Sequence, residues 1–216
     1  MKKPVFITGI GTDVGKTLVA AVLTQALGAD YWKPVQAGRE PSTDAETLRQ
    51  LVQNPSVKIH APAYEFDLPA SPHLSARAAG RDIEVVKLYE SFQQIQESRP
   101  HQQLLIEGAG GLLVPLHQKI LMADFIKLLQ AEVILVSRNY LGSINHSLLT
   151  AAFCRSNDIP VLGWVFTDSY MDYEDEIVEW SGYPKIASIP KLEAVDANRV
   201  AATAAELLPA LQKYFL

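Results

Sequence analysis

A glycine-punctuated loop near the start of the chain carries the residues with the clearest chemistry. Segment 8–17 reads Thr-Gly-Ile-Gly-Thr-Asp-Val-Gly-Lys-Thr and follows the apolar run 5–7. Glycines let backbone N–H groups converge on phosphate oxygens, and the N-terminal end of a following helix attracts the same anion. Lys16 can then reach the outer phosphates, and the Thr17 hydroxyl can bind Mg²⁺. Gly9 lies one residue too early for the strict pattern, so we interpret the segment as a variant phosphate-binding loop.

Two charged side chains occur where apolar strands are expected. Glu107 ends the apolar run 104–106 and precedes Gly-Ala-Gly-Gly. Beside a phosphate loop such a carboxylate is a candidate Mg²⁺ ligand, and a solvated acid at a strand end is the alternative. Lys33 lies in the run 31–35, where an ammonium needs wet or anionic surroundings. Extension of the lysine to the surface is the alternative there.

Short β-rich runs alternate with segments of helical length. We expect strands over residues 5–8, 31–35, 103–107, 133–137, 161–167 and 185–188, and helices over residues 16–27, 44–51, 83–96, 122–129, 144–156, 173–180 and 197–214. This alternation predicts an α/β fold with a mostly parallel β-sheet and helices on both faces. Residues 54–81 contain four prolines and are predicted to form an ordered excursion over the sheet edge. Ligands of such sheets bind at the carboxyl ends of the strands.

Length and composition are typical of one compact domain over residues 1–216, with 48% hydrophobic and 20% charged residues. The formal net charge of −5 argues against a nucleic acid as partner. The single cysteine, Cys154, excludes an internal disulfide and a cysteine-based metal cluster, and it favours a reducing cytoplasm. No apolar stretch reaches the about 18 residues of a membrane span, so we expect no membrane partner.

Several short blocks, taken together, are more specific than any one of them. They are segment 9–17, Lys33-Pro34-Val35, Thr43-Asp44-Ala45, Ser71-Pro72-His73, segment 107–111, segment 141–146 and Gly163-Trp164-Val165. In this order and spacing the chain resembles the dethiobiotin synthetase family along nearly its whole length. The resemblance implies a P-loop NTPase-like fold and an ATP-dependent cyclo-ligase of biotin biosynthesis. Such enzymes convert 7,8-diaminononanoate, CO₂ and Mg-ATP to dethiobiotin, ADP and phosphate, through a carbamate and a carbamic–phosphoric anhydride.

The resemblance also implies roles for individual residues. ATP would contact Gly11, Thr12, Asp13, Val14, Gly15, Lys16 and Thr17 through its phosphates, and Thr167, Pro190 and Leu192 near its base. The metal ligands would be Thr17, Asp44 and Glu107, and the catalytic residues Thr12, Lys16 and Lys33. The diamine would contact Lys33, Ala37, Gly110, Gly111, Ser143, Ile144 and Asn145, the last three across a homodimer interface. Because the reacting groups are anionic, the two lysines and Mg²⁺ would neutralise charge on the γ-phosphate and carbamate oxygens.

Four positions depart from the family's usual residues. Asp13 stands where glutamate is common, and Tyr140 where some relatives carry a basic residue. Ala37 lacks a usual hydroxyl near the diamine. Thr167 replaces an asparagine that commonly reads adenine, and one hydroxyl cannot offer an amide's paired donor and acceptor.

Residues 143–145 are expected to start a helix, with Ser143 and Asn145 as capping residues and free N–H groups that suit a carboxylate. A plain helix start is the alternative. His73 and His146 are single histidines without metal partners in the sequence. We expect both to make structural hydrogen bonds.

Two further function classes share parts of this pattern. A corrin-pathway amide synthetase has a similar loop and acidic strand end, but it usually carries a glutaminase domain, for which 216 residues leave no room. A partition-type ATPase expects an extra lysine at the start of the loop, which Ile10-Gly11 lacks. We therefore expect the ligase.

Overall fold

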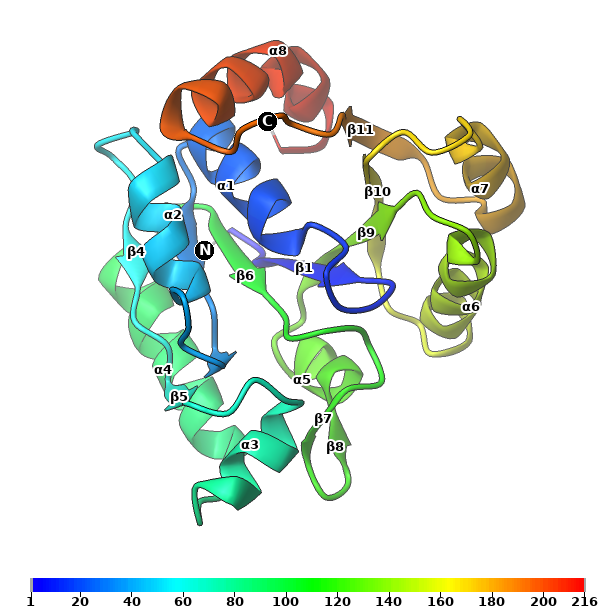
Figure 1. Cartoon of the computed structure of the whole chain (residues 1–216). Helices are drawn as coiled ribbons and strands as arrows, with labels where there is room; N and C mark the ends of the chain where they lie inside the picture. The colour runs from blue at the N-terminus through cyan, green and yellow to red at the C-terminus, as the bar shows by residue number, and fades with distance from the viewer. Residues whose placement is uncertain (1, 216) are drawn as a thin grey trace.

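The computed structural model describes residues 2–215 (Figure 1). Within them a parallel sheet of seven strands forms the centre. Its strands, from one edge to the other, are β11 (Lys185–Ile189), β10 (Val161–Thr167), β9 (Glu132–Arg138), β1 (Val5–Gly9), β6 (Leu104–Glu107), β2 (Asp30–Trp32) and β4 (Ile59–His60). Two small sheets accompany it: β3 (Val35–Ala37) with β5 (Tyr64–Phe66), and β7 (Pro115–His117) with β8 (Ile120–Leu121).

Helices cover both faces of the main sheet, as the alternation predicts (Figure 1). One face carries α1 (Lys16–Leu27), α2 (Asp44–Leu51) and α8 (Ala197–Phe215). The opposite face carries α4 (Val85–Ser98), α5 (Met122–Leu128), α6 (Ser143–Ser156) and α7 (Glu174–Ser181). The short helix α3 (Pro72–Ala78) packs beside β3 and β7. No helix among residues 2–215 is long and apolar enough to cross a membrane.

Alternation within the buried strands builds two cores. In β1, Val5 and Ile7 pack on the α1 side, whereas Phe6 packs on the α5 side and meets Phe125 edge-on. Successive strand residues point to opposite faces, so both faces of each central strand must be apolar. The same period places Leu105 of β6 on the α1 face.

The predicted strand 31–35 is confirmed only for residues 31–32, which lie in β2; as one continuous strand it is wrong, because the chain leaves the main sheet after Trp32 and forms a separate strand, β3, from Val35. Pro34 has no backbone N–H to donate to a strand ladder. β3 instead pairs with β5, and Lys33 lies in the break between the two strands.

The excursion 54–81 is ordered, as expected, but it contains elements that were not predicted. β4 is the edge strand of the main sheet, β5 pairs with β3, and α3 follows. Strands of two or three residues are too short to show a period. The other predicted strands and helices are confirmed, with boundaries that differ by at most two residues.

Candidate active site

The loop between β1 and α1 turns tightly around two glycines. Gly15 is the N-cap of α1 and has φ 88°, in the left-handed region that favours glycine. A Cβ atom on Gly9 would lie 2.5 Å from Cγ2 of Val14, so the close turn excludes a side chain there. Lys16 folds back over the loop, and its Nζ donates to the carbonyl oxygen of Gly11 at 2.8 Å. The hydrogen bond therefore holds the Lys16 ammonium against the loop that is expected to bind phosphates.

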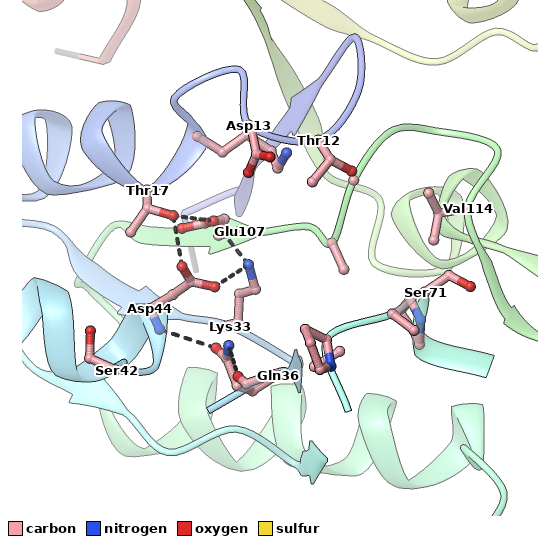
Figure 2. A pocket seen from close by; sticks show the side chains of 18 of the residues that line it. Thr12, Asp13, Thr17, Lys33, Gln36, Ser42, Asp44, Ser71, Glu107 and Val114 are labelled. Carbon is pink, nitrogen blue, oxygen red and sulfur yellow. Dashed lines mark hydrogen bonds and ion pairs between the residues drawn. The ribbon is translucent and has the colours of Figure 1, made fainter. Parts of the chain in front are cut away.

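A hydroxyl and two carboxylates meet at the carboxyl end of the sheet (Figure 2). Oγ1 of Thr17, in the first turn of α1, lies 2.8 Å from Oδ1 of Asp44 and 2.9 Å from Oε1 of Glu107. Asp44 is the first residue of α2, whose start is fixed by a capping box between Thr43 and Glu46. Glu107 ends β6 and is 1% exposed. The structure thus brings the three expected metal ligands together.

Lys33 joins the two carboxylates (Figure 2). Its Nζ lies 2.6 Å from Oδ2 of Asp44 and 3.0 Å from Oε1 of Glu107. The side chain is buried, so extension to the surface is excluded. Burial alone would lower the pKa of Lys33, but the carboxylates of Glu107 and Asp44 outweigh it and raise this pKa. Burial opposes ionisation of Asp44, but Lys33 outweighs it and lowers the pKa of Asp44.

Lys16 has a different electrostatic environment. Burial, and then repulsion by Lys33, lower the pKa of Lys16 to about 8. Its ammonium is therefore less firmly protonated than that of Lys33. An anion bound beside Lys16 would favour the charged form.

Two supporting residues were not predicted. Burial raises the pKa of Tyr31 well above its usual value, so its hydroxyl keeps its proton and donates it to Oε2 of Glu107 at 2.8 Å. Oε1 of Gln36 accepts from the backbone N–H of Asp44 at 3.2 Å, and its Nε2 donates to the carbonyl oxygen of Gly38 at 2.8 Å. The sequence held one signal for Tyr31: it is two residues before Lys33, and such residues share a face of an extended chain.

A cavity of about 860 Å³ opens beside this cluster. Ten of the predicted site residues line it: Thr12, Asp13, Gly15, Lys16, Thr17, Lys33, Ala37, Asp44, Glu107 and Gly110. The remaining wall consists of residues that were not assigned to the site: Gln36, Gly38, Glu40, Ser42, Pro69, Ala70, Ser71, Pro72, Ala109 and Val114. Segment 69–72 belongs to the excursion, which therefore does build part of the cavity wall.

Other predicted residues support the loop or lie beyond it. Gly11 accepts the hydrogen bond from Lys16, and a Cβ atom on Gly111 would lie 3.0 Å from the carbonyl oxygen of Gly9. Oγ1 of Thr167 donates to the carbonyl oxygen of Val14 at 2.9 Å.

Two predicted base contacts follow the edge strand of the sheet. Pro190 is exposed and Leu192 is half-buried, in the segment after β11. The structure does not bring either residue into the cavity.

The start of α6 does not line this cavity. Ile144 lies at a separate hollow of about 310 Å³, and Asn145 is exposed. Gly142 is the N-cap and no side chain caps the helix, so the expected capping by Ser143 and Asn145 is wrong. The Ser143 side chain is turned inward instead, and its Oγ lies 2.6 Å from the hydroxyl of Tyr173.

Both histidines make the expected hydrogen bonds. Nδ1 of His73 lies 3.1 Å from Oγ of Ser71, and Nδ1 of His146 lies 2.8 Å from the hydroxyl of Tyr140. Neither histidine lines the cavity.

The first strand of this parallel sheet leads through a glycine loop into a helix that starts with Lys16 and Thr17, and the neighbouring strand ends in an acid. These features together define a P-loop nucleotide-binding protein. The sequence also matches the family described as "AAA domain" over residues 3–199. It is 44% identical to the ATP-dependent dethiobiotin synthetase of Cytophaga hutchinsonii, over 95% of this chain and 97% of that protein. It is 39% identical to the ATP-dependent dethiobiotin synthetase of Brucella abortus, over 93% of this chain and 92% of that protein. The chain belongs to the family of ATP-dependent dethiobiotin synthetases.

Solved structures agree on the fold. The MinD cell division protein of Aquifex aeolicus superposes with a TM-score of 0.59 at 15% identity, over 96% of this chain and 98% of that one. A plasmid partition protein from Borrelia burgdorferi superposes with a TM-score of 0.59 at 12% identity, over 99% of this chain and 100% of that one. At these identities the likeness shows the P-loop α/β fold alone. The family match does not favour a partition-type ATPase or a corrin-pathway synthetase.

Proposed function

We propose that the chain is an ATP-dependent ligase that carboxylates 7,8-diaminononanoate with CO₂ and closes it to the cyclic urea dethiobiotin, with release of ADP and phosphate. One observation carries the proposal. In a member of this family, Lys16, Thr17, Lys33, Asp44 and Glu107 come from distant parts of the sequence to one wall of one cavity. The two ammonium groups there suit anionic phosphate and carbamate oxygens, and the two carboxylates suit a divalent cation.

The donor set fits Mg²⁺. Within residues 2–215, no three His, Cys, Asp or Glu side chains come together as an all-protein metal site. Mg²⁺ commonly binds through one or two carboxylates, with waters and substrate phosphates completing the shell. Thr17, Asp44 and Glu107 offer a hydroxyl and two carboxylates for such a shell. When bound there, Mg²⁺ would neutralise charge on the phosphate oxygens.

The proposed chemistry has three bond-forming steps. One diamine nitrogen adds to CO₂ and loses a proton to give a carbamate. A carbamate oxygen then takes the γ-phosphoryl group of ATP, and ADP leaves. The second nitrogen attacks the carbamate carbon, the bond to the phosphate oxygen breaks, and the ring closes as a proton is lost.

The lysines would act where negative charge gathers. Lys16, on the phosphate loop, would meet the transferring phosphoryl group, where stabilising the developing charge gives phosphoryl transfer its rate. Lys33, which lies between β2 and β3, would contact the carbamate oxygens. Thr12, Ala37 and Gly110 line the same cavity and would bound the diamine. Gly111 would support the loop beside it.

We also propose that the active form is a homodimer. Leu141 is 87% exposed and Met171 is 75% exposed, and both border the hollow at the start of α6 together with Tyr170. Grouped apolar side chains at a surface are typical of an interface. The first turn of α6, at Ser143, Ile144 and Asn145, would then bind the carboxylate of a diamine held by the partner subunit, because an uncapped helix N-terminus suits an anion.

The test is ADP release measured with and without diaminononanoate and bicarbonate, with the product identified by mass spectrometry. We expect turnover to require both substrates and to yield dethiobiotin. Lys16→Ala should abolish turnover but keep the diamine affinity measured by calorimetry. ATP turnover that is indifferent to the diamine would instead support a switch-type ATPase.

A further inference from the structure

Tyr31 contacts the site from behind the cavity. It is the middle residue of β2 and pairs in parallel register with Leu105 of β6, two residues before Glu107. Residues two apart share a face of a strand, so the phenol ring can extend along the sheet to the Glu107 carboxylate. Its hydroxyl donates to Oε2 at 2.8 Å. Tyr31 is fully buried and is not among the residues that line the cavity.

The two carboxylate oxygens of Glu107 have separate partners. Oε1 lies 2.9 Å from the Thr17 hydroxyl and 3.0 Å from Nζ of Lys33, and both of these residues line the cavity. Oε2 receives its hydrogen bond from Tyr31. A buried carboxylate oxygen without a donor is costly, so the phenol strongly favours this one orientation of the side chain.

We propose that Tyr31 is a positioning residue that fixes Glu107 so that Oε1 alone serves the cavity. The inference rests on the proposed role of Glu107 in binding the divalent cation. Mg²⁺ demands near-octahedral geometry, which a carboxylate free to rotate would satisfy less often. Groups that hold a metal ligand in place commonly matter almost as much as the ligand itself.

The chain offers a matched pair of variants. Tyr31→Phe removes one oxygen and keeps the ring that fills the core. Tyr64→Phe removes the same atom from another buried tyrosine, whose hydroxyl accepts from the backbone N–H of Glu84 at 3.0 Å and which does not line the cavity. Each variant removes one hydrogen bond from a buried tyrosine. Only the first loses one that reaches Glu107.

The experiment measures binding of Mn²⁺ to the full chain in the presence of ADP, by the loss of the free-ion electron paramagnetic resonance signal. We expect Tyr31→Phe to weaken Mn²⁺ binding about 10-fold, as loss of such supporting groups does elsewhere, and Tyr64→Phe to leave it unchanged. Metal-free ADP affinity should be the same in both. Thermal unfolding with and without Mn²⁺ and ADP gives a second readout, in which Tyr31→Phe should lose part of the metal-dependent stabilisation.

The variant Glu107→Gln distinguishes the proposed metal-binding role of Glu107 from the proposed positioning role of Tyr31. If it weakens Mn²⁺ binding and Tyr31→Phe does not, the role of Tyr31 is overturned and the proposed function stands. If Glu107→Gln has no effect, the metal role of Glu107 fails and the inference fails with it. In the double variant, no loss beyond that of Glu107→Gln is expected, because Tyr31 acts through Glu107. An additive loss would overturn the proposal.

Discussion

Oγ1 of Thr167 donates to the carbonyl oxygen of Val14 at 2.9 Å, which ties the end of β10 to the phosphate loop across 153 positions of sequence. The threonine is buried, and its methyl carbon lies 3.0 Å from where a Cβ of Gly15 would be. A hydroxyl has one proton, and here the loop takes it. Toward a nucleotide base Thr167 could therefore only accept a hydrogen bond. We expect its main effect in this chain to be on the shape of the loop.

We therefore expect Thr167→Val to raise the KM for ATP and to leave the KM for the diamine nearly unchanged. Valine keeps the shape but leaves the Val14 carbonyl without its donor, a loss of about 1 kcal/mol or roughly fivefold in the KM for ATP. Thr167→Ser retains the hydroxyl and should stay close to wild type. The check is steady-state kinetics with each substrate varied in turn. An unchanged KM for ATP in the valine variant would show that the hydrogen bond does not shape the loop.

Lys33→Met should destabilise the folded protein as well as stop turnover. It leaves the carboxylates of Asp44 and Glu107 close together without their ammonium, and breaking such a buried pair costs about 3 kcal/mol or more. Urea unfolding at pH 7 measures the loss. Added Mg²⁺ should recover part of it, because a cation would again lie between the acids. The control is Lys185→Met, since the exposed pair of Lys185 with Asp175 should contribute at most about 1 kcal/mol.

Local motifs account for the part of this site that the sequence predicts. Residues 9–17 carry both the phosphate loop and the helix start, so Lys16 and Thr17 are placed by their immediate neighbours. The family resemblance alone assigns Asp44 to the metal site, and the structure shows the local reason for its position: a Thr43–Glu46 capping box that fixes where α2 begins. Glu107 is placed by the end of its strand. Each of these signals is contained in a few consecutive residues.

The unpredicted contacts depend on how distant strands align. The hydrogen bond from Tyr31 to Glu107 spans 76 positions and needs the register of β2 against β6. The contact of Thr167 with the loop needs the face of β10 that also carries Val165. Neither register nor face is set by local composition. The break at Pro34 was a local signal that outweighed the apolar run, because a proline cannot donate to a ladder.

Lys16 should make ATP capture depend on pH. With its pKa lowered to about 8, the lysine is an ammonium below that pH and neutral above it. Because kcat/KM reports the free enzyme, kcat/KM for ATP should fall above pH 8, toward tenfold per pH unit. The bound triphosphate raises the pKa again, so kcat should stay level to higher pH. Steady-state rates measured from pH 6.5 to 9.5 give the profile. If kcat/KM for ATP stays constant up to pH 9.5, the prediction is contradicted.

Asn145 should serve the site of the neighbouring subunit, which subunit mixing can reveal. The residue is exposed on the first turn of α6 and does not line the cavity of its own chain. Asn145→Asp should inactivate the enzyme by placing a negative charge where the substrate carboxylate would bind, and Lys16→Ala should inactivate it at the phosphate loop. A hybrid dimer of the two would hold one intact site and one doubly altered site.

Random exchange of equal amounts makes half of the dimers hybrids, so recovery should approach about one quarter of wild-type activity. Each variant alone supplies the baseline, and native mass spectrometry measures the exchange. Complete exchange without recovered activity would mean that both residues serve the same subunit's site.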